Sequence, residues 1–372
     1  MGILLCVVSL LIVVVTRWVF RWRNPKCNGV LPPGSMGFPI IGETLQYFSA
    51  QPLQEGKIFQ SWYTESALKI TGGLLVHQGD AHRYLKNLAR NIFGPESLRD
   101  ELVHEIDRVT RRHLSLWHAS DEVNVKEATE IMLLELAAKM LMGLDEAKAS
   151  ELRQNYKNFK ESFVSFPLNI PGFGFHSVMR GKKRALEIIR ETIAERRRSK
   201  EIRQDFLSEE HDRILIGRDK EVEGITWAEY KSMSFTHMVI NEIVRLADNV
   251  FGMFRRVLQE VNIKGRYTIP AGWVMVAIPS VTHLNPNEYQ DPYSFNPSRW
   301  KGKEMHTASK NFLAFGGGRR MCSGADFAKL QLAIFIHYMV TRYSWKITKE
   351  GLIVRKPGLA FPEPLCIRLT TN

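Results

Sequence analysis

The sequence has little cysteine and no arrangement of cysteine and histidine that would hold a structural metal. Its four cysteines stand at Cys6, Cys27, Cys322 and Cys366, and no two of them form a CxxC pair. Four scattered thiols are too few for a disulfide framework, and the absence of Cys/His clusters excludes the usual zinc patterns. This cysteine usage is typical of a protein whose body faces the reducing cytosol.

The sequence also lacks internal repeats, low-complexity tracts and the motifs of nucleic-acid-binding domains. The 372 residues carry a formal net charge of +12, much of it in residues 17–26 and 180–203. No zinc finger, basic zipper or RNP-type aromatic motif accompanies this charge, so nucleic acid is not expected as a partner. The spacing of 180–203 predicts a solvated amphipathic helix, and the excess charge fits an anionic membrane surface or an acidic protein.

One long apolar run, residues 3–15, stands at the N-terminus and is followed by Arg17. A membrane span needs about 20 apolar residues, which this segment reaches if the Arg17 side chain extends to the interface. A cleaved signal peptide is the alternative, but it would carry positive charge before the run and a small-residue cleavage site after it. We therefore predict a membrane anchor helix over 1–23, a basic and Pro/Gly-rich hinge over 24–43, and a cytosolic body over 44–372.

Most of the body has the spacing of helices, and signals for strands are few. Apolar residues recur at helical spacing over 124–144, and a Thr-x-x-Glu capping box opens a predicted helix over 226–247. The nearly all-apolar stretch 325–343 predicts a buried helix. Strands are expected in a hairpin over 262–279 and in the last residues of the chain. The predicted fold class is therefore mainly α with a small β region.

The stretch FGGGRRMCSGADFAKL, residues 315–330, places one cysteine between a glycine-rich loop and this last helix. A thiolate is the form that binds metal, and its pKa falls near cations and helix N-termini. Two arginines directly precede Cys322, and the helix that follows would supply free N–H groups. The glycines let the backbone turn sharply and pass close to a flat group. A buried, inert thiol is the ordinary interpretation of one cysteine, but it does not account for this combination.

The spacing F-x-x-G-x-R-x-C-x-G resembles the haem-binding loop of the cytochrome P450 superfamily, the haem-thiolate monooxygenases. In this chain it is formed by Phe315, Gly318, Arg320, Cys322 and Gly324. The resemblance implies that Cys322 is the axial thiolate of the haem iron and that Arg320 pairs with a haem propionate. An axial thiolate pushes electron density onto the iron and favours cleavage of the O–O bond.

Two further motifs match the E-x-x-R-R triad of the same family. Glu242 and Arg245 stand at i,i+3 and would share one helix face, and Arg299 in FNPSRW matches the second arginine. An i,i+3 pair taken alone is usually a surface salt bridge. The resemblance implies instead a buried three-member charge network behind the haem loop.

Other cations match positions that bind the haem propionates in the family. Arg255, in FRRV, matches a second propionate arginine. The segment GDAHRYLKNLAR resembles the family's C helix, where His82 and Lys86 lie at i,i+4 on one face and would make the remaining propionate contacts. Simple surface exposure is the alternative for His82.

The resemblance covers nearly the whole chain. Segments such as FPLNIPGFGFH and VTHLNPNEYQDPYSFNPSRW look like the plant clan that oxidises brassinosteroids, other sterols and triterpenoids. The family implies a haem cofactor, an apolar small-molecule substrate and electrons from NADPH through NADPH–cytochrome reductase. It also implies contact with membrane lipid in the endoplasmic reticulum, with the body in the cytosol. No residue of the sequence identifies one substrate.

The chain departs from the family in one respect that bears on activity. The central-helix motif [AG]-G-x-[DE]-T-[ST], whose acid and alcohol relay protons to bound oxygen, is absent. Deletions are expected near 50–56 and 207–215, so the predicted cytochrome P450 fold is incomplete and no catalytic residue is assigned. Two functions stay open: a membrane-anchored monooxygenase, or a catalytically impaired truncated isoform, decayed gene product or mispredicted gene model that keeps the haem-binding loop.

Overall fold

The computed structural model of the protein describes most of the chain. The described residues are 2–23, 27–32, 79–142, 144, 148–153, 170–198, 224–247, 249, 252–263, 265–303, 311–355 and 359–371. The chain forms two compact units. The first consists of Met1–Glu65, Asp248–Pro292 and Arg355–Leu359, and the second of Ser66–Ala247, Tyr293–Val354 and Ala360–Asn372.

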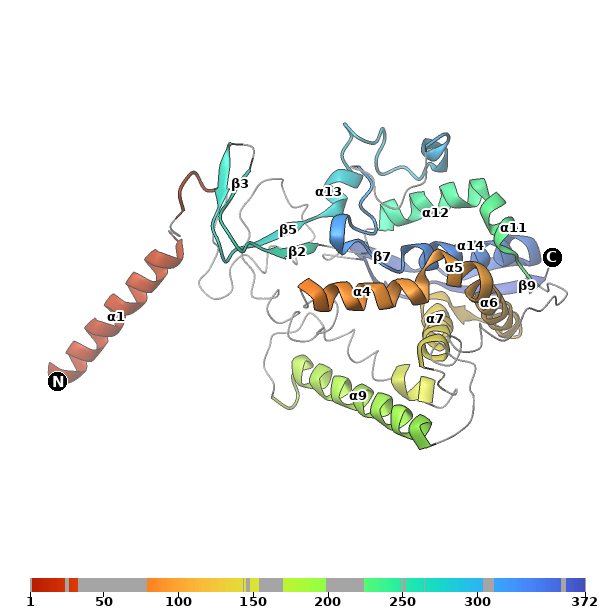
Figure 1. The fold of residues 1–372 in the computed structure, drawn as a ribbon, viewed down its shortest axis with the longest axis horizontal. Coiled ribbons are helices and arrows are strands. Elements are labelled where there is room, and N and C mark those ends of the chain that lie inside the picture. The colour runs from red at the N-terminus through yellow and green to blue at the C-terminus, as the bar shows by residue number, and fades with distance from the viewer. Residues whose placement is uncertain are drawn as a thin grey trace. The chain divides into compact units, whose positions relative to one another are not determined.

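Helices make up most of the described chain, as predicted (Figure 1). The shorter helical segments are α5 (Pro95–Ser97), the π-helical η2 (Leu98–Leu102), α11 (Trp227–Ser232), α13 (Pro279–His283), and the 3₁₀ segments η3 (Pro297–Trp300) and η4 (Gly318–Arg320). The longer helices are α1 (Gly2–Arg23), α4 (Gly79–Phe93), α6 (Val103–His118), α7 (Val125–Met142), α9 (Gly174–Arg198), α12 (Ser234–Ala247) and α14 (Ala325–Arg342).

The strands form small antiparallel sheets. In the second unit, β9 lies between β1 and β6, with Val123 opposite Ile367 and Tyr343 opposite Thr371. In the first unit, β2 pairs with β5 and β3 pairs with β4, which places the predicted hairpin within two short ladders. The bounds are β1 (Val123–Asn124), β2 (Met253–Arg256), β3 (Val261–Ile263), β4 (Tyr267–Ile269), β5 (Val274–Ala277), β6 (Tyr343–Lys349), β7 (Leu352–Arg355), β8 (Leu359–Glu363) and β9 (Cys366–Thr371).

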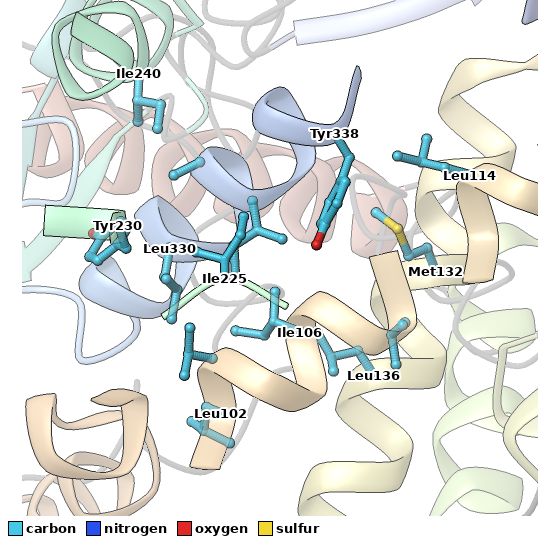
Figure 2. Packing of buried hydrophobic residues seen from close by; sticks show 14 of the residues in the cluster. Leu102, Ile106, Leu114, Met132, Leu136, Ile225, Tyr230, Ile240, Leu330 and Tyr338 are labelled. Carbon is cyan, nitrogen blue, oxygen red and sulfur yellow. The ribbon is translucent and has the colours of Figure 1, made fainter. Parts of the chain in front are cut away.

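The core of the second unit lies where α14 packs against α6, with α7, α12 and β9 around them. Figure 2 shows Ile106 of α6, Leu330 of α14 and Ile225 gathered in this cluster. The buried Asp107 accepts hydrogen bonds from the Tyr338 hydroxyl at 2.5 Å and from the Ile225 N–H at 3.2 Å. The segment that leads into α11 is thereby attached directly to α6 and α14. The helix predicted to be buried is only partly so, because α14 buries residues such as Leu330, Ile334 and Tyr338 while Val340 is exposed.

The helix predicted over 226–247 is present but is interrupted at Met233. Its capping box is confirmed, because the Thr226 side chain accepts from the Glu229 N–H while the Glu229 carboxylate accepts from the Thr226 N–H. At the break, the Tyr230 carbonyl accepts from the Met233 N–H at 3.3 Å, and Nε2 of His237 lies 3.0 Å from the same oxygen. These contacts end α11, and α12 begins at Ser234 and runs in a new direction (Figure 1).

The N-terminal segment forms the helix α1 over the predicted residues. Within the described parts of the chain, however, no helix is both long enough and apolar enough to cross a membrane. The transmembrane span predicted for 1–23 is therefore not supported by the structure. Most of the hinge predicted over 24–43 and the deletions predicted near 50–56 and 207–215 lie outside the described residues. The division into anchor, hinge and body stays a prediction.

Candidate functional site

The loop before α14 is closed by its own backbone. Gly316 and Gly318 adopt φ values of 75° and 63°, which side-chain-bearing residues rarely adopt, so glycine is needed at these two positions for the loop to turn. The Cys322 N–H donates to the Phe315 carbonyl at 2.9 Å. The thiol of Cys322 is exposed and stands three residues before the first residue of α14.

Open space lies beside this loop. A Cβ placed on Gly318 or on Gly324 would meet no atom within 4 Å. The Ser323 hydroxyl, next to the thiol, is buried and has no hydrogen-bond partner among the described residues. The loop therefore offers an accessible sulfur, glycines against which a flat group could lie, and an unsatisfied polar atom beside them.

Cations from α4 lie beside the loop. The Lys86 ammonium donates to the Arg319 carbonyl at 2.8 Å. Desolvation, followed by the positive charges of Arg320 and Lys86, holds the pKa of the half-buried His82 below its ordinary value. The structure thus brings His82, Lys86 and Arg320 together beside the loop, and their contacts with the haem propionates stay a prediction. The end of α4 is held on α14 by Phe93 and Phe327, whose ring centroids are 5.2 Å apart.

The second cluster of predicted residues is a closed network around the Glu242 carboxylate. Arg245 donates to it through Nε at 2.9 Å and Nη2 at 2.8 Å, and both side chains are fully buried. Arg299 Nε donates to Oε1 at 2.9 Å, the Asn296 N–H donates to the same oxygen at 3.0 Å, and Trp300 Nε1 donates to Oε2 at 3.0 Å. The predicted triad is therefore assembled, and a backbone amide and an indole complete it.

The protonation of Glu242 follows from these contacts. Burial by itself raises the pKa of a carboxyl group, because the charged form loses its water. The hydrogen bonds from Arg245, Asn296, Trp300 and Arg299 outweigh burial and lower the pKa of Glu242 to about 2. The carboxylate is therefore ionised at neutral pH and holds both guanidinium groups.

Aromatic packing connects the charge network with the loop. Trp300 stacks edge-on against Phe312, with centroids 4.8 Å apart, and Phe312 is buried three residues before Phe315. The indole donates to Glu242 on one side and packs against the start of the loop on the other. The network around Glu242 thus fixes where the loop begins.

Arg255 lies in the first unit, on β2. Its side chain is exposed, and Nη1 donates to the neighbouring Phe254 carbonyl at 2.8 Å. Its predicted contact with a haem propionate stays a prediction.

Sequence analysis missed three side-chain or backbone groups of the site. Trp300 stands inside the quoted FNPSRW motif, so the motif itself held the signal, and Asn296 belongs to the same motif. Lys329 is buried on α14 with its ammonium 5.9 Å from the centre of the Phe315 ring. A lysine in a mostly apolar stretch of helix was the available signal for that contact.

Comparison with known proteins identifies the family. A family model named Cytochrome P450 matches residues 198–366. The rice protein Cytochrome P450 87A3 is 38% identical to this chain over 455 aligned positions, which cover 95% of this chain and 88% of the rice protein. The chain belongs to the cytochrome P450 family. It is by family a monooxygenase, and its cofactor is haem.

Other relatives and solved structures agree with this assignment. Beta-amyrin 16-alpha-hydroxylase of Maesa lanceolata is 31% identical, with 98% of each chain covered. The solved structure of a retinoic acid-bound cyanobacterial cytochrome P450, CYP120A1, has a TM-score of 0.77 at 19% identity and covers 93% of this chain and 100% of its own. The fold is therefore the cytochrome P450 fold.

The residues of the loop fit haem. An exposed thiol can ligate iron, and the glycines leave space beside it in which the flat macrocycle could lie. The cations His82, Lys86 and Arg320 suit the two carboxylates of the group, since charge-assisted hydrogen bonds favour anionic partners. The unsatisfied Ser323 hydroxyl is a polar atom that a bound group or water at this place would reach.

Proposed function

We propose that this chain binds haem through the Cys322 sulfur and inserts one oxygen atom from O₂ into an apolar substrate of the sterol, brassinosteroid or triterpenoid type. One observation carries the proposal. The exposed Cys322 stands on a loop closed by its own hydrogen bond to Phe315, with cations gathered at the loop's edge. An apolar loop around a buried thiol would not support it.

Each residue of the site has a distinct proposed role. When bound, haem with a thiolate ligand supplies the oxidising chemistry. Cys322 would hold the iron, and Arg320, His82 and Lys86 would bind the propionates, with Arg255 as a further propionate contact. The shape of the loop would depend on Phe315, Gly318 and Gly324. Its position would be stabilised by the network of Glu242, Arg245 and Arg299. No side chain of this chain is assigned to proton transfer, because the acid and alcohol motif is absent from the sequence.

The substrate class is proposed from the relatives. Names among them include Cucurbitadienol 11-hydroxylase of Siraitia grosvenorii, 28% identical, and Cholesterol 22-monohydroxylase of Paris polyphylla, 27% identical. Both names refer to hydroxylation of large, apolar polycyclic alcohols. An apolar substrate of this kind partitions into lipid, which supports attachment of the chain to a membrane.

Electrons and membrane attachment belong to the same proposal. We propose NADPH–cytochrome reductase as the electron donor, and the net charge of +12 suits an acidic docking surface on such a partner. We propose that α1 contacts lipid of the endoplasmic reticulum, with the body in the cytosol. Its large apolar side chains are exposed along the described part of the helix, from Val7 to Phe20.

A second candidate function is a product that keeps the haem loop without monooxygenase activity. It is favoured by the alignment with the rice protein, which runs over 455 positions although this chain has 372 residues in all. Many positions of the rice protein therefore stand opposite gaps in this chain. Absence of the [AG]-G-x-[DE]-T-[ST] motif is what such a gap in the central helix would produce.

A spectrum tests the haem site, and turnover then separates the two functions. The full chain, loaded with haem and reduced, should give a red-shifted Soret band with carbon monoxide. Cys322→Ser should lose that band, while Cys27→Ser, a cysteine outside the loop, should keep it. A flat difference spectrum from folded protein would overturn the proposal. If the band is present but reductase and NADPH yield no hydroxylated triterpenoid or sterol, the truncated product is the correct function.

A further inference from the structure

A buried cation lies directly under the cysteine loop. Lys329, on the second turn of α14, is only 6% exposed, and its ammonium is 5.9 Å from the centre of the Phe315 ring. The next residue, Leu330, has no exposed surface, and Ala325 and Ala333, each four residues from Lys329 on the helix, are also buried. A lysine is rarely buried in such a place unless its charge has a partner.

Two features of the structure compensate the charge of Lys329. The face of the Phe315 ring attracts a cation through its π-electrons, and the Asp326 carboxylate lies one turn earlier on the same helix. Burial lowers the pKa of Lys329, Asp326 raises it, and the nearby Lys231 lowers it. Lys231 is itself placed over other rings, those of Trp227 and Tyr230. Lys329 thus contacts the loop through the Phe315 ring.

Phe315 is also the residue that closes the loop. Its carbonyl accepts the Cys322 N–H at 2.9 Å, so the ring faces Lys329 while the backbone of the same residue holds the cysteine. Movement of the ring would move the carbonyl and with it the backbone that carries the thiol. The contact between a helix side chain and an aromatic ring is thus linked to the position of Cys322 through one hydrogen bond.

We propose that Lys329 is a positioning residue, whose buried ammonium holds the Phe315 ring and through it the loop that presents Cys322. The first consequence concerns the protein without haem: the closing hydrogen bond of the loop is stabilised by the cation. The second consequence rests on the proposed haem site. A positive charge on the thiolate side favours the reduced iron, so its removal shifts the midpoint potential to more negative values.

The first test uses the haem-free full chain and does not depend on haem binding. Amide hydrogen exchange at Cys322 reports the closing hydrogen bond. Lys329→Met keeps the length and removes the charge, and exchange at this amide should accelerate about tenfold, the size expected when a desolvated cation–π contact is lost. Lys329→Arg keeps a cation over the ring and should restore slow exchange. Lys126→Met removes a similar cation–π contact, with Phe361 at 5.7 Å, far from the loop in sequence, and should leave this amide unchanged.

Further variants keep the test decisive if Lys329→Met does not fold. Phe315→Leu retains Lys329 and the backbone carbonyl but removes the ring, so it should accelerate exchange at Cys322 to a similar extent. Slow exchange in both Lys329→Met and Phe315→Leu, or equal acceleration in Lys126→Met, would overturn the proposal. Failure of Lys329→Arg to restore protection would also overturn it, because a role of size alone would then be indicated.

The second test separates this inference from the proposed function. In the haem-loaded chain, Lys329→Met should shift the midpoint potential to more negative values, and Lys329→Arg should return it toward that of the unmodified protein. An unmodified chain that binds no haem would refute the proposed function, while the exchange measurement still decides the role of Lys329. A chain that binds haem with the same potential in all variants would refute the second consequence of the inference.

Discussion

The two charged clusters of the second unit differ in the groups that they bring together. Around Glu242, a buried carboxylate accepts from two arginines, an indole and a backbone amide. Beside Cys322, by contrast, the cations of α4 and of the loop stand together at an exposed thiol. The first cluster can be understood as part of the fold, and the second as a place that binds a partner with negative charge.

This difference explains why the two clusters should respond to opposite kinds of experiment. Loss of one member from a closed, buried network leaves the others without a partner and therefore lowers the stability of the fold. Loss of one cation from an exposed group relieves repulsion in the free protein and weakens only the binding of an anion. Trp300 and Phe312 connect the clusters, because they link the closed network to the start of the loop.

The largest expected effect is that of Glu242→Gln on unfolding. The amide cannot neutralise Arg245 and Arg299, so two guanidinium groups stay buried next to a neutral group. We expect the free energy of unfolding to fall by about 3–5 kcal/mol, measured by urea denaturation. Glu122→Gln, at an exposed carboxylate that accepts from Thr348, is the matched control and should change it by less than about 0.5 kcal/mol. Equal effects would show that the closed network is not part of the stability of the fold.

The pH dependence of stability is the second largest effect. The pKa of Glu242 is about 2 in the folded protein and 4.5 ordinarily, so the carboxyl binds its proton more weakly when folded. Its contribution, about 3 kcal/mol, is present in full above the ordinary pKa and is lost as the pH falls from about 4.5 through about 2. The free energy of unfolding, measured by urea denaturation at several pH values in this interval, should fall more steeply with decreasing pH in the unmodified protein than in Glu242→Gln. If the free energies of unfolding of the two proteins changed equally with pH, the lowered pKa of Glu242 would be contradicted.

Local sequence patterns predicted those parts of the site whose residues are close together in the sequence. Glu242 and Arg245 share a helix face at i,i+3, and the capping box of Thr226 and Glu229 is equally local, so spacing alone was informative. The loop at Cys322 was predictable because its glycines and cysteine stand at fixed spacing. The helix interruption at Met233 was not, because the apolar pattern continues across it and contacts of the Tyr230 carbonyl end α11.

Other features depended on long-range packing that no local pattern contains. Lys329 was not predicted because a lysine is usually exposed, and its burial beside the Phe315 ring depends on how the loop packs on α14. The attachment of Ile225 to Asp107 joins residues more than a hundred positions apart. For α1, the apolar sequence predicted a helix correctly, whereas the membrane span inferred from the same residues was not supported.

A smaller effect is expected where the closed network meets the loop. Trp300→Phe removes the hydrogen bond from the indole to Glu242 but keeps an aromatic ring against Phe312. The free energy of unfolding should fall by about 1.5–3 kcal/mol, the value for a hydrogen bond to a charged group. Trp345→Phe, on the exposed strand β6, is the control and should have little effect. If both substitutions cost the same, the indole donor does not stabilise the carboxylate.

The smallest effect is that of Lys86→Met, which tests the group of cations beside Cys322. The substitution removes the ammonium that donates to the Arg319 carbonyl and reduces the positive charge beside Cys322. Because the group is partly exposed, haem affinity should weaken by about two- to fivefold, while unfolding of the haem-free chain changes by less than about 0.5 kcal/mol. Titration of haemin into the apoprotein, followed by its Soret absorbance, measures the haem affinity, and urea denaturation measures the stability.

Lys346→Met, at an exposed lysine of β6, is the control and should change neither quantity. A large loss of stability with unchanged haem affinity would reverse the distinction between the clusters, since Lys86 would then act as part of the fold.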